Sequence, residues 1–241
     1  SLEYELYMRA ARLALKLRKY KRSVDLILHS AEVDMSSNSV SEEVRANERN
    51  RFLADMAAGC LDQQNEESAD YAIKKLPDPI LKAELLIKKS KYFIKAGDVV
   101  AANAELDQAT KLAANIEDLS RRASVLLNML TLAQKLDPAR MYEINRSAAK
   151  SINALQVPNK KDEETDTENY KLYVTKIMVV NWNLLPTVSE LSNVDLNGAA
   201  DLANRIEKKE IKILADYIIT VRTIENFRTE AKTNKAAVAT R

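Results

Sequence analysis

A reactive thiol and an imidazole base each occur once in the chain. The 241-residue sequence contains one cysteine, Cys60, and one histidine, His29. A thiolate–imidazole pair needs both groups within hydrogen-bond reach and a third residue that orients the base. Helical spacing places His29 toward water and Cys60 on an apolar face, so we interpret Cys60 as a core residue. The single copies also exclude a multi-His or multi-Cys metal site, a Glu-x-x-His di-iron bundle and an intramolecular disulfide.

A run of acids at alternate positions from Asp162 to Glu168 is the second place where chemistry is conceivable. Asp162-Glu163-x-x-Asp166 is similar to the aspartate-rich motif with which helical isoprenoid synthases hold magnesium. That chemistry needs a second acidic cluster on a facing helix, which the sequence lacks. A calcium loop would need glycine where Thr167 stands and a bidentate glutamate where Tyr173 stands. We expect a solvated polar loop, with weak cation binding as the alternative, and assign no catalytic residue, metal or cofactor.

Composition excludes further classes of function. Three glycines in the whole chain leave no glycine-rich phosphate loop. A net charge of +2 gives no field on the scale that nucleic acids require, so we expect no nucleic-acid partner. The longest aliphatic run, Ile177–Val180, is too short to span a bilayer, which predicts a soluble chain without a transmembrane segment. Its compartment stays open between the cytoplasm and export after removal of an upstream segment.

Basic residues cluster near the N-terminus and are our candidates for partner binding. Four of them lie in one narrow arc of a helix expected over residues 3–34, and they are Arg9, Arg12, Lys16 and Lys19. This arc can dock an acidic partner, an anionic membrane surface or a phosphate backbone. The alternative is a solvated helix face whose long side-chain stems flank the core.

The helix expected over residues 3–34 is predicted from apolar residues that recur at alternating spacings of four and three. The stripe consists of Leu6, Ala10, Leu13, Leu17, Tyr20, Val24 and Ile27. Ser39 with Glu42 offers a capping box for a second helix over residues 40–62.

Aspartates and one glycine mark the turns in the middle of the chain. Asp78 and Asp137 each precede a proline, Asp118 can cap another helix, and Gly97 precedes Asp98 at a tight turn. The expected helices cover residues 66–76, 79–96, 99–115, 119–135 and 138–155. Such short connections favour antiparallel neighbours.

The later part of the chain begins with a polar break at residues 157–168. A helix resumes near Tyr170, Pro186 is expected to punctuate it, and Asp195 can cap a helix over residues 196–206. A final helix is expected over residues 208–228, followed by a disordered tail at 229–241. Aromatic residues at helical spacing, such as Tyr170, Tyr173 and Trp182, usually belong to a core, although exposed ones would make partner hot spots.

Several helices look like copies of one another. A shift of 40 residues superposes Asp78, Ala83, Leu86 and Lys95 on the identical Asp118, Ala123, Leu126 and Lys135. A two-helix period of this length is typical of a helical solenoid. With small residues such as Ala83 and Ala123 at the helix crossings, the chain resembles the tetratricopeptide-like α-solenoid superfamily. The elements Leu184-Leu185-Pro186 and Leu202-Ala203 add a closer similarity to uncharacterised bacterial helical-repeat proteins.

The resemblance implies an all-α, right-handed α-solenoid of antiparallel helix pairs with about nine or ten helices. It carries no site residues to transfer. We expect an N-terminal helical hairpin at residues 1–64, a helical-repeat solenoid at 65–228 and the tail beyond. The expected function is a non-catalytic scaffold that binds a protein or peptide partner, self-association included. The alternative is an all-helical enzyme or small-ligand binder with an acidic site.

Overall fold

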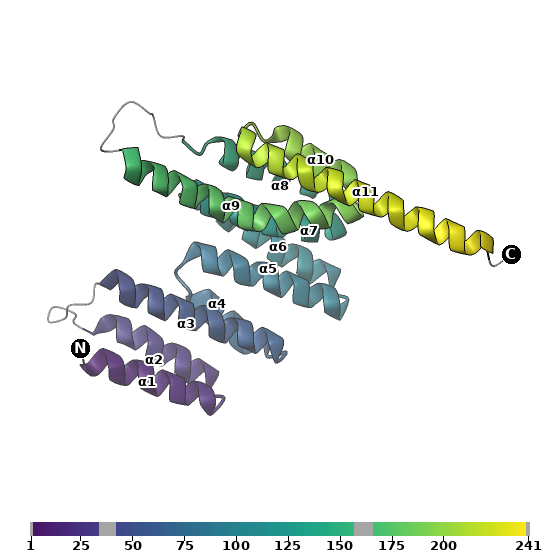
Figure 1. The fold of residues 1–241 in the computed structure, drawn as a ribbon. Coiled ribbons are helices and arrows are strands. Elements are labelled where there is room, and N and C mark those ends of the chain that lie inside the picture. The colour runs from purple at the N-terminus through teal and green to yellow at the C-terminus, as the bar shows by residue number, and fades with distance from the viewer. Residues whose placement is uncertain (1, 34–41, 157–165, 240–241) are drawn as a thin grey trace. The chain divides into compact units, whose positions relative to one another are not determined.

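The computed structural model describes residues 2–33, 42–156 and 166–239, and every regular element in them is an α-helix. The prediction of an all-α fold is therefore confirmed. Eleven helices lie in these ranges, against the nine or ten expected. The chain divides into two compact units, residues 1–112 and 113–241. Figure 1 shows the helices of each unit stacked side by side.

The first unit consists of helices packed in neighbouring pairs. They are α1 (Leu2–Lys16), α2 (Tyr20–Glu32), α3 (Glu42–Asp62), α4 (Glu66–Lys75), α5 (Pro79–Ala96) and α6 (Val99–Ala114), whose last two residues lie past the unit boundary. Helix α1 packs on α2, and α3 packs on α4 and α5 (Figure 1). Helices α2 and α4 are tied by Lys21–Glu67 at 2.6 Å and by Tyr71, which donates to Asp25 at 2.8 Å.

Several helices begin at side-chain caps, at the positions predicted from the sequence. The Asp78 carboxylate accepts from the N–H groups of Ile80 and Leu81 at 2.8 and 3.1 Å, with Pro79 at the first helical position. Asp118 and Asp137 cap α7 and α8 in the same way, and Asp195 caps α10 by accepting from the Gly198 N–H at 2.9 Å. Gly97 ends α5 with φ +81°, a left-handed conformation that glycine adopts without a steric penalty. These four caps and this turn confirm the predicted punctuation.

The prediction of one helix over residues 3–34 is wrong. Helix α1 ends at Lys16 and α2 begins at Tyr20, with Arg18 in the left-handed region at φ +55° between them. The chain reverses there, so α2 packs back on α1, and the Ser23 hydroxyl donates to the Ala11 carbonyl at 2.8 Å. A turn of three residues adds little to the phase of the apolar pattern, which is why periodicity alone did not reveal it.

The predicted apolar stripe is also wrong over α1, although Val24 and Ile27 of α2 are buried as expected. The inward face of α1 consists of Tyr4, Met8, Ala11 and Ala14. Leu6, Leu13 and Leu17 are exposed instead. The sequence has two apolar faces on this helix, and periodicity does not say which of them a neighbour covers.

The second unit contains five helices around one core. They are α7 (Leu119–Leu136), α8 (Pro138–Asn153), α9 (Asp166–Val194), α10 (Leu196–Arg205) and α11 (Lys209–Ala239). Helix α7 packs on α8 and α9, and α10 packs on α8, α9 and α11, as Figure 1 shows. Fully buried side chains of α7 and α8 form the centre, and they are Leu127, Met129, Leu130, Met141, Ile144 and Ile152.

Polar side chains fix the spacing of helices in this unit. The buried Asn145 amide of α8 donates to the Gly198 carbonyl of α10 at 3.0 Å. Thr187 of α9 donates to the Leu127 carbonyl of α7 at 3.3 Å. A Cβ at position 198 would lie 2.7 Å from the Met141 Cε and 2.8 Å from the Asp195 carboxylate, so a larger residue there would require these side-chain ends to move.

Pro186 does not punctuate the chain as predicted, because α9 continues through it from Asp166 to Val194. Proline has no N–H, so it cannot donate to the carbonyl of Trp182 four residues earlier. Trp182 lies on the exposed side of α9, where water can hydrate that carbonyl. Packing of the flanking Leu184 and Val188, both fully buried, holds the helix together across the proline.

The predicted helix end at residue 228 is wrong as well. Helix α11 continues to Ala239 through the segment expected to be a disordered tail. Residues 229–239 contain four alanines, two lysines and one glutamate, which are residue types of high helix propensity. The acidic residues Asp162, Glu163 and Glu164 and the predicted cap Ser39 lie outside the described residues.

Candidate functional site

The four basic residues predicted for partner binding do not all lie on one helix. Arg9, Arg12 and Lys16 lie on α1, whereas Lys19 lies in the turn directly before α2. The Arg12 guanidinium donates to Glu48 of α3 at 2.9 Å and lies 6.0 Å from the centre of the Phe52 ring. Arg12 is thus engaged within the unit, and the turn at Arg18 takes Lys19 off the helix. Arg9, Lys16 and Lys19 remain exposed.

Glu48 joins α1 to α3 through a second contact. Its other carboxylate oxygen accepts a hydrogen bond from the buried Tyr4 hydroxyl at 2.8 Å, and the Arg45 guanidinium stacks 4.8 Å from the Tyr4 ring centre. Burial, together with the hydrogen bond to Glu48, raises the pKa of Tyr4 far above its ordinary value. The phenol therefore stays protonated as a donor, and this group of residues has a structural role.

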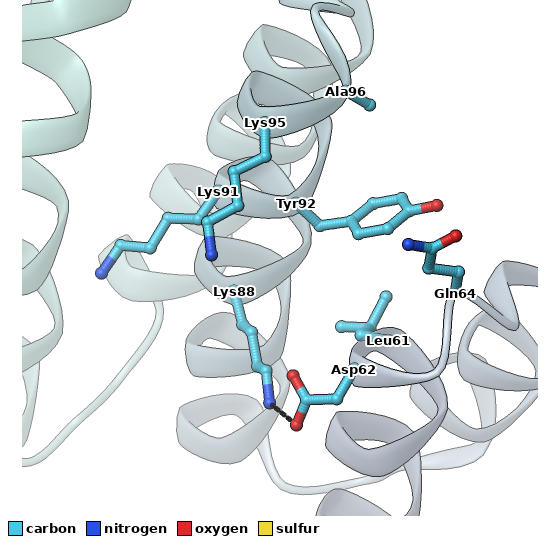
Figure 2. A pocket seen from close by; sticks show the side chains of 8 residues that line it. All are labelled: Leu61, Asp62, Gln64, Lys88, Lys91, Tyr92, Lys95 and Ala96. Carbon is cyan, nitrogen blue, oxygen red and sulfur yellow. Dashed lines mark hydrogen bonds and ion pairs between the residues drawn. The ribbon is translucent and has the colours of Figure 1, made fainter.

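A pocket of about 550 Å³ lies between the C-terminal end of α3 and α5, and we call it the lysine pocket (Figure 2). Its lining consists of Leu61, Asp62, Gln64, Lys88, Lys91, Tyr92, Lys95 and Ala96. The three lysines come from one face of α5, because residues three and seven positions apart share a helix face. Figure 2 shows the Tyr92 ring lying toward Gln64, and Lys88 bonded to Asp62.

The lysine pocket has an excess of positive charge. Lys88 is held by the Asp62 carboxylate at 2.8 Å and by the Ala58 carbonyl at 3.2 Å. Lys91 and Lys95 are exposed and take part in none of the ion pairs found among the described residues of this unit. Three ammonium groups and one carboxylate in the lining favour an anionic ligand over a cationic one. This lining contains neither histidine, serine nor cysteine.

A second pocket, of about 350 Å³, lies between the α1–α2 turn and α3. Lys16 lines it together with Arg18, which was not among the predicted site residues. Cys60 also lines it but is only 1% exposed, and burial raises the pKa of its thiol, so the thiol stays protonated. His29 is exposed and bonded to Glu32 at 3.0 Å. The interpretation of Cys60 as a core residue and of His29 as solvent-facing is confirmed.

The second unit exposes two apolar helix faces that the sequence did not predict as surface. The α9 stripe consists of Val174, Met178, Trp182 and Leu185, and the α11 stripe of Ile213, Tyr217, Ile224 and Phe227. In each stripe the residues are spaced by three, four or seven positions and share one side of their helix. The two helices pack on each other, as Figure 1 shows.

Trp182 is the most exposed member of these stripes, with 81% of its surface open to solvent. The expectation of a core residue is wrong for Trp182 and for Tyr170, which is also exposed, whereas Tyr173 is half-buried. The opposite side of α9 supplies Val180, Leu184 and Val188 to the core. Helical spacing identifies both sides of α9 as apolar, but only one of them is buried in the core.

The described residues contain no group of three or more histidine, cysteine, aspartate or glutamate side chains arranged to hold a metal ion. In the same residues, no helix combines the length and apolar character needed to cross a lipid bilayer. Comparison of the chain with protein-family models, curated proteins and solved structures gives no significant match.

Proposed function

We propose that the chain is a non-catalytic protein–protein interaction module with the repeat architecture of an α-solenoid. Helix pairs support the repeat, since their first helices begin at Leu2, Glu42 and Pro79 in one unit and at Leu119 and Asp166 in the other. These starts are about 40 residues apart, a spacing found in helical repeats. Helices of like position also contact each other, α2 with α4 and α7 with α9.

The single observation that carries the function is the exposed α9 stripe around Trp182. Tryptophan is the residue type most enriched among the hot spots of protein interfaces. A soluble protein that keeps such a side chain in water loses the hydrophobic stabilisation that its burial would supply. Met178 and Leu185 on the same face provide the apolar rim that excludes water around an anchoring aromatic ring.

The α9 stripe is presented on a rigid support. Helix α9 is held from behind by α7, through the Thr187 hydrogen bond and the buried Leu184. A partner that contacts Trp182 therefore does not have to order a flexible loop, which lowers the entropic cost of association. The partner we expect is a protein or peptide with a complementary apolar face.

Site-specific photo-crosslinking tests the proposal in cells of the organism that makes the protein. A photoreactive phenylalanine analogue at Met178 is expected to capture a partner, which mass spectrometry identifies. The matched control places the same analogue at Arg146, an exposed position on α8. The captured partner should then lose affinity for a Trp182→Ala variant and keep it for Arg146→Ala. Equal capture at both positions would contradict the proposal.

The lysine pocket supports a second candidate function, the binding of an anionic small ligand. The alternative expected from the sequence was an acidic site, and the lining of this pocket instead contains Lys88, Lys91 and Lys95. Calorimetric titration with citrate, inorganic phosphate and a short acidic peptide tests it. Binding should vanish in Lys91→Glu/Lys95→Glu and survive in Lys74→Glu, which changes an exposed lysine of α4. No heat from any of the three probes removes this candidate.

A further inference from the structure

The pocket between the α1–α2 turn and α3, which we call the turn pocket, has an apolar floor. Phe52, Met56 and Gly59 follow one another on α3 at spacings of four and three residues, so they share one side of that helix. Leu15, near the end of α1, adds a further apolar side chain to the lining. The volume of about 350 Å³ lies within the range of small-molecule sites, about 300–1,000 Å³. The turn pocket is therefore large enough for a small molecule with an apolar body.

Gly59 keeps the floor of the turn pocket open. It lies inside α3, where glycine is less favourable than alanine. It does not adopt the left-handed conformation that Gly97 adopts, and a Cβ at this position would meet nothing within 4 Å. Neither backbone conformation nor close packing therefore requires glycine here. Its effect is to leave free the space that a side chain would occupy in the pocket.

Two cationic side chains that lack an internal partner line the same pocket. Neither the Lys16 ammonium nor the Arg18 guanidinium forms a hydrogen bond or an ion pair with any residue that the structure describes. By contrast, Arg12 and Lys21 of the same helix pair are each held by a glutamate. Asp55 supplies the one carboxylate among the described lining residues and pairs with neither cation. The lining is therefore net positive, and its cations are available to an anionic ligand.

The backbone conformation of Arg18 is unfavourable for an arginine. Its φ of +55° lies in the left-handed region, where a Cβ approaches the following carbonyl oxygen. Glycine or asparagine would form the same helix-ending turn at less cost. Backbone strain of this kind is concentrated at ligand-binding and active sites. What arginine adds at this position, and glycine would not, is the guanidinium in the lining of the pocket.

A hydrogen bond across the turn pocket orients one more polar group. The Tyr20 hydroxyl donates to the Oε1 atom of Gln63 at 2.8 Å, and both residues line the pocket. Because the amide oxygen accepts this bond, the Nε2 group of Gln63 keeps its two hydrogens for other acceptors. The pocket thus combines an apolar floor with two cations and a neutral donor.

We propose that the turn pocket binds a small aromatic carboxylate. The ring of the ligand packs on Phe52 and Met56, since aromatic and thioether side chains both make favourable contacts with an aromatic ring. Its carboxylate is bound by Arg18, whose planar guanidinium can donate two parallel hydrogen bonds, and by Lys16. For a ligand of this size we expect a dissociation constant on the order of 100 µM. The site is separate from the α9 stripe, so it does not depend on the protein-binding function proposed above.

Titration of the full chain with 3-phenylpropionate, followed by two-dimensional NMR of the backbone amides, tests the proposal. The amide signals of residues 15–20 and 52–63 should shift, whereas those of the second unit should stay in place. Two matched probes separate the contributions of the ring and the charge. 3-Phenylpropanol lacks the carboxylate and acetate lacks the ring, and each should bind more weakly by about tenfold or more.

Two variants alter the turn pocket without weakening the fold. Arg18→Gly removes the guanidinium and relieves the left-handed strain, so it should be at least as stable as the parent chain and lose about tenfold or more in affinity. Gly59→Leu fills open space and should abolish binding. The controls are Arg22→Gln, which changes an exposed arginine outside the lining, and Lys91→Glu/Lys95→Glu in the lysine pocket. Both should bind as the parent chain does.

Several outcomes would overturn the proposal. They are unchanged amide signals at residues 15–20 and 52–63 with millimolar 3-phenylpropionate, equal affinity for 3-phenylpropanol, and full binding by Gly59→Leu. An equal loss of affinity in Arg18→Gly and Arg22→Gln would do the same, because it would mean that the ligand responds to surface charge alone.

Discussion

The ammonium of Lys89 lies 2.8 Å from the carboxylate of Glu105, and the two side chains are only 7% and 12% exposed. The same ammonium lies 2.5 Å from Asp70 and 3.8 Å from Glu66, so one cation on α5 holds acids from α4 and α6. Phe93 shields it from one side, with its ring centre 5.3 Å from the nitrogen. This contact ties three helices of the first unit together through a single charge.

Replacement of Lys89 by methionine should therefore destabilise the chain strongly. The methionine keeps the length of the side chain but leaves three carboxylates facing one another without a cation. Removal of one partner of a buried ion pair costs about 3–5 kcal/mol. Urea unfolding followed by circular dichroism measures the loss. The control Lys88→Met removes the more exposed Asp62 pair and should cost less than about 1 kcal/mol. Equal losses in the two variants would contradict the structural role given to Lys89.

Stability should fall at alkaline pH. Burial raises the pKa of Tyr4, and the hydrogen bond to Glu48 raises it further. Burial lowers the pKa of Lys89, but the hydrogen bonds to Asp70 and Glu105 outweigh it, so the net shift is upward. A raised pKa in the folded state gives stability that is complete below the unfolded value, about 10 for both groups, and is lost as pH rises above it.

The alkaline effect can be assigned to Tyr4 with one variant. Tyr4→Phe removes the titrating phenol, so its free energy of unfolding should fall less steeply with pH above about 10 than that of the parent chain. Urea unfolding at a series of pH values provides the slopes. Parallel slopes for the two proteins would show that Tyr4 does not titrate differently in the folded and unfolded states.

The fluorescence of Trp182 should already resemble that of an indole in water. It is the only tryptophan in the sequence and 81% of its surface is exposed. Emission and acrylamide quenching should therefore change little when urea unfolds the chain, and a blue shift should report a partner that covers the α9 stripe. A strongly blue-shifted native spectrum would mean that the ring is covered in the free protein.

Two glycines should respond to alanine with opposite signs. Gly97 has φ +81°, where an alanine costs about 1–2 kcal/mol because its Cβ approaches the following carbonyl oxygen. Gly59 lies inside α3, and a Cβ there meets nothing within 4 Å. Gly59→Ala should stabilise the helix by up to about 1 kcal/mol. Thermal and urea unfolding of the two variants decide the matter, and shifts of the same sign would contradict the geometry at one of the positions.

Local signals in the sequence predicted the helix ends well. A capping carboxylate acts on the N–H groups two or three residues after it, so Asp78, Asp118, Asp137 and Asp195 reveal their role within a few positions. Gly97 is similar, because a left-handed residue ends a helix by itself. The turn at Arg18 was not predicted, because arginine is not a residue type typical of the left-handed region that Arg18 adopts.

Features that depend on distant neighbours were not predictable in this way. Helical spacing shows that α1 has apolar residues, but whether Met8 or Leu6 is covered depends on α2. The same ambiguity led to the prediction that Trp182 is a core residue, although it is exposed. The ion pairs of Lys89 join residues from three helices, so the residue spacing within one helix does not predict them.

Pro186 gives the exposed side of α9 a directional marker. Because the proline cannot donate to the Trp182 carbonyl, that oxygen retains hydrogen-bonding capacity next to the indole ring. An apolar surface alone binds many partners with little preference. A partner that places a donor group at this oxygen gains a hydrogen bond. A partner with an entirely apolar surface would desolvate the oxygen and leave it without a donor. For the partner that we propose, the missing N–H of Pro186 would thus leave one polar contact available within an otherwise apolar surface.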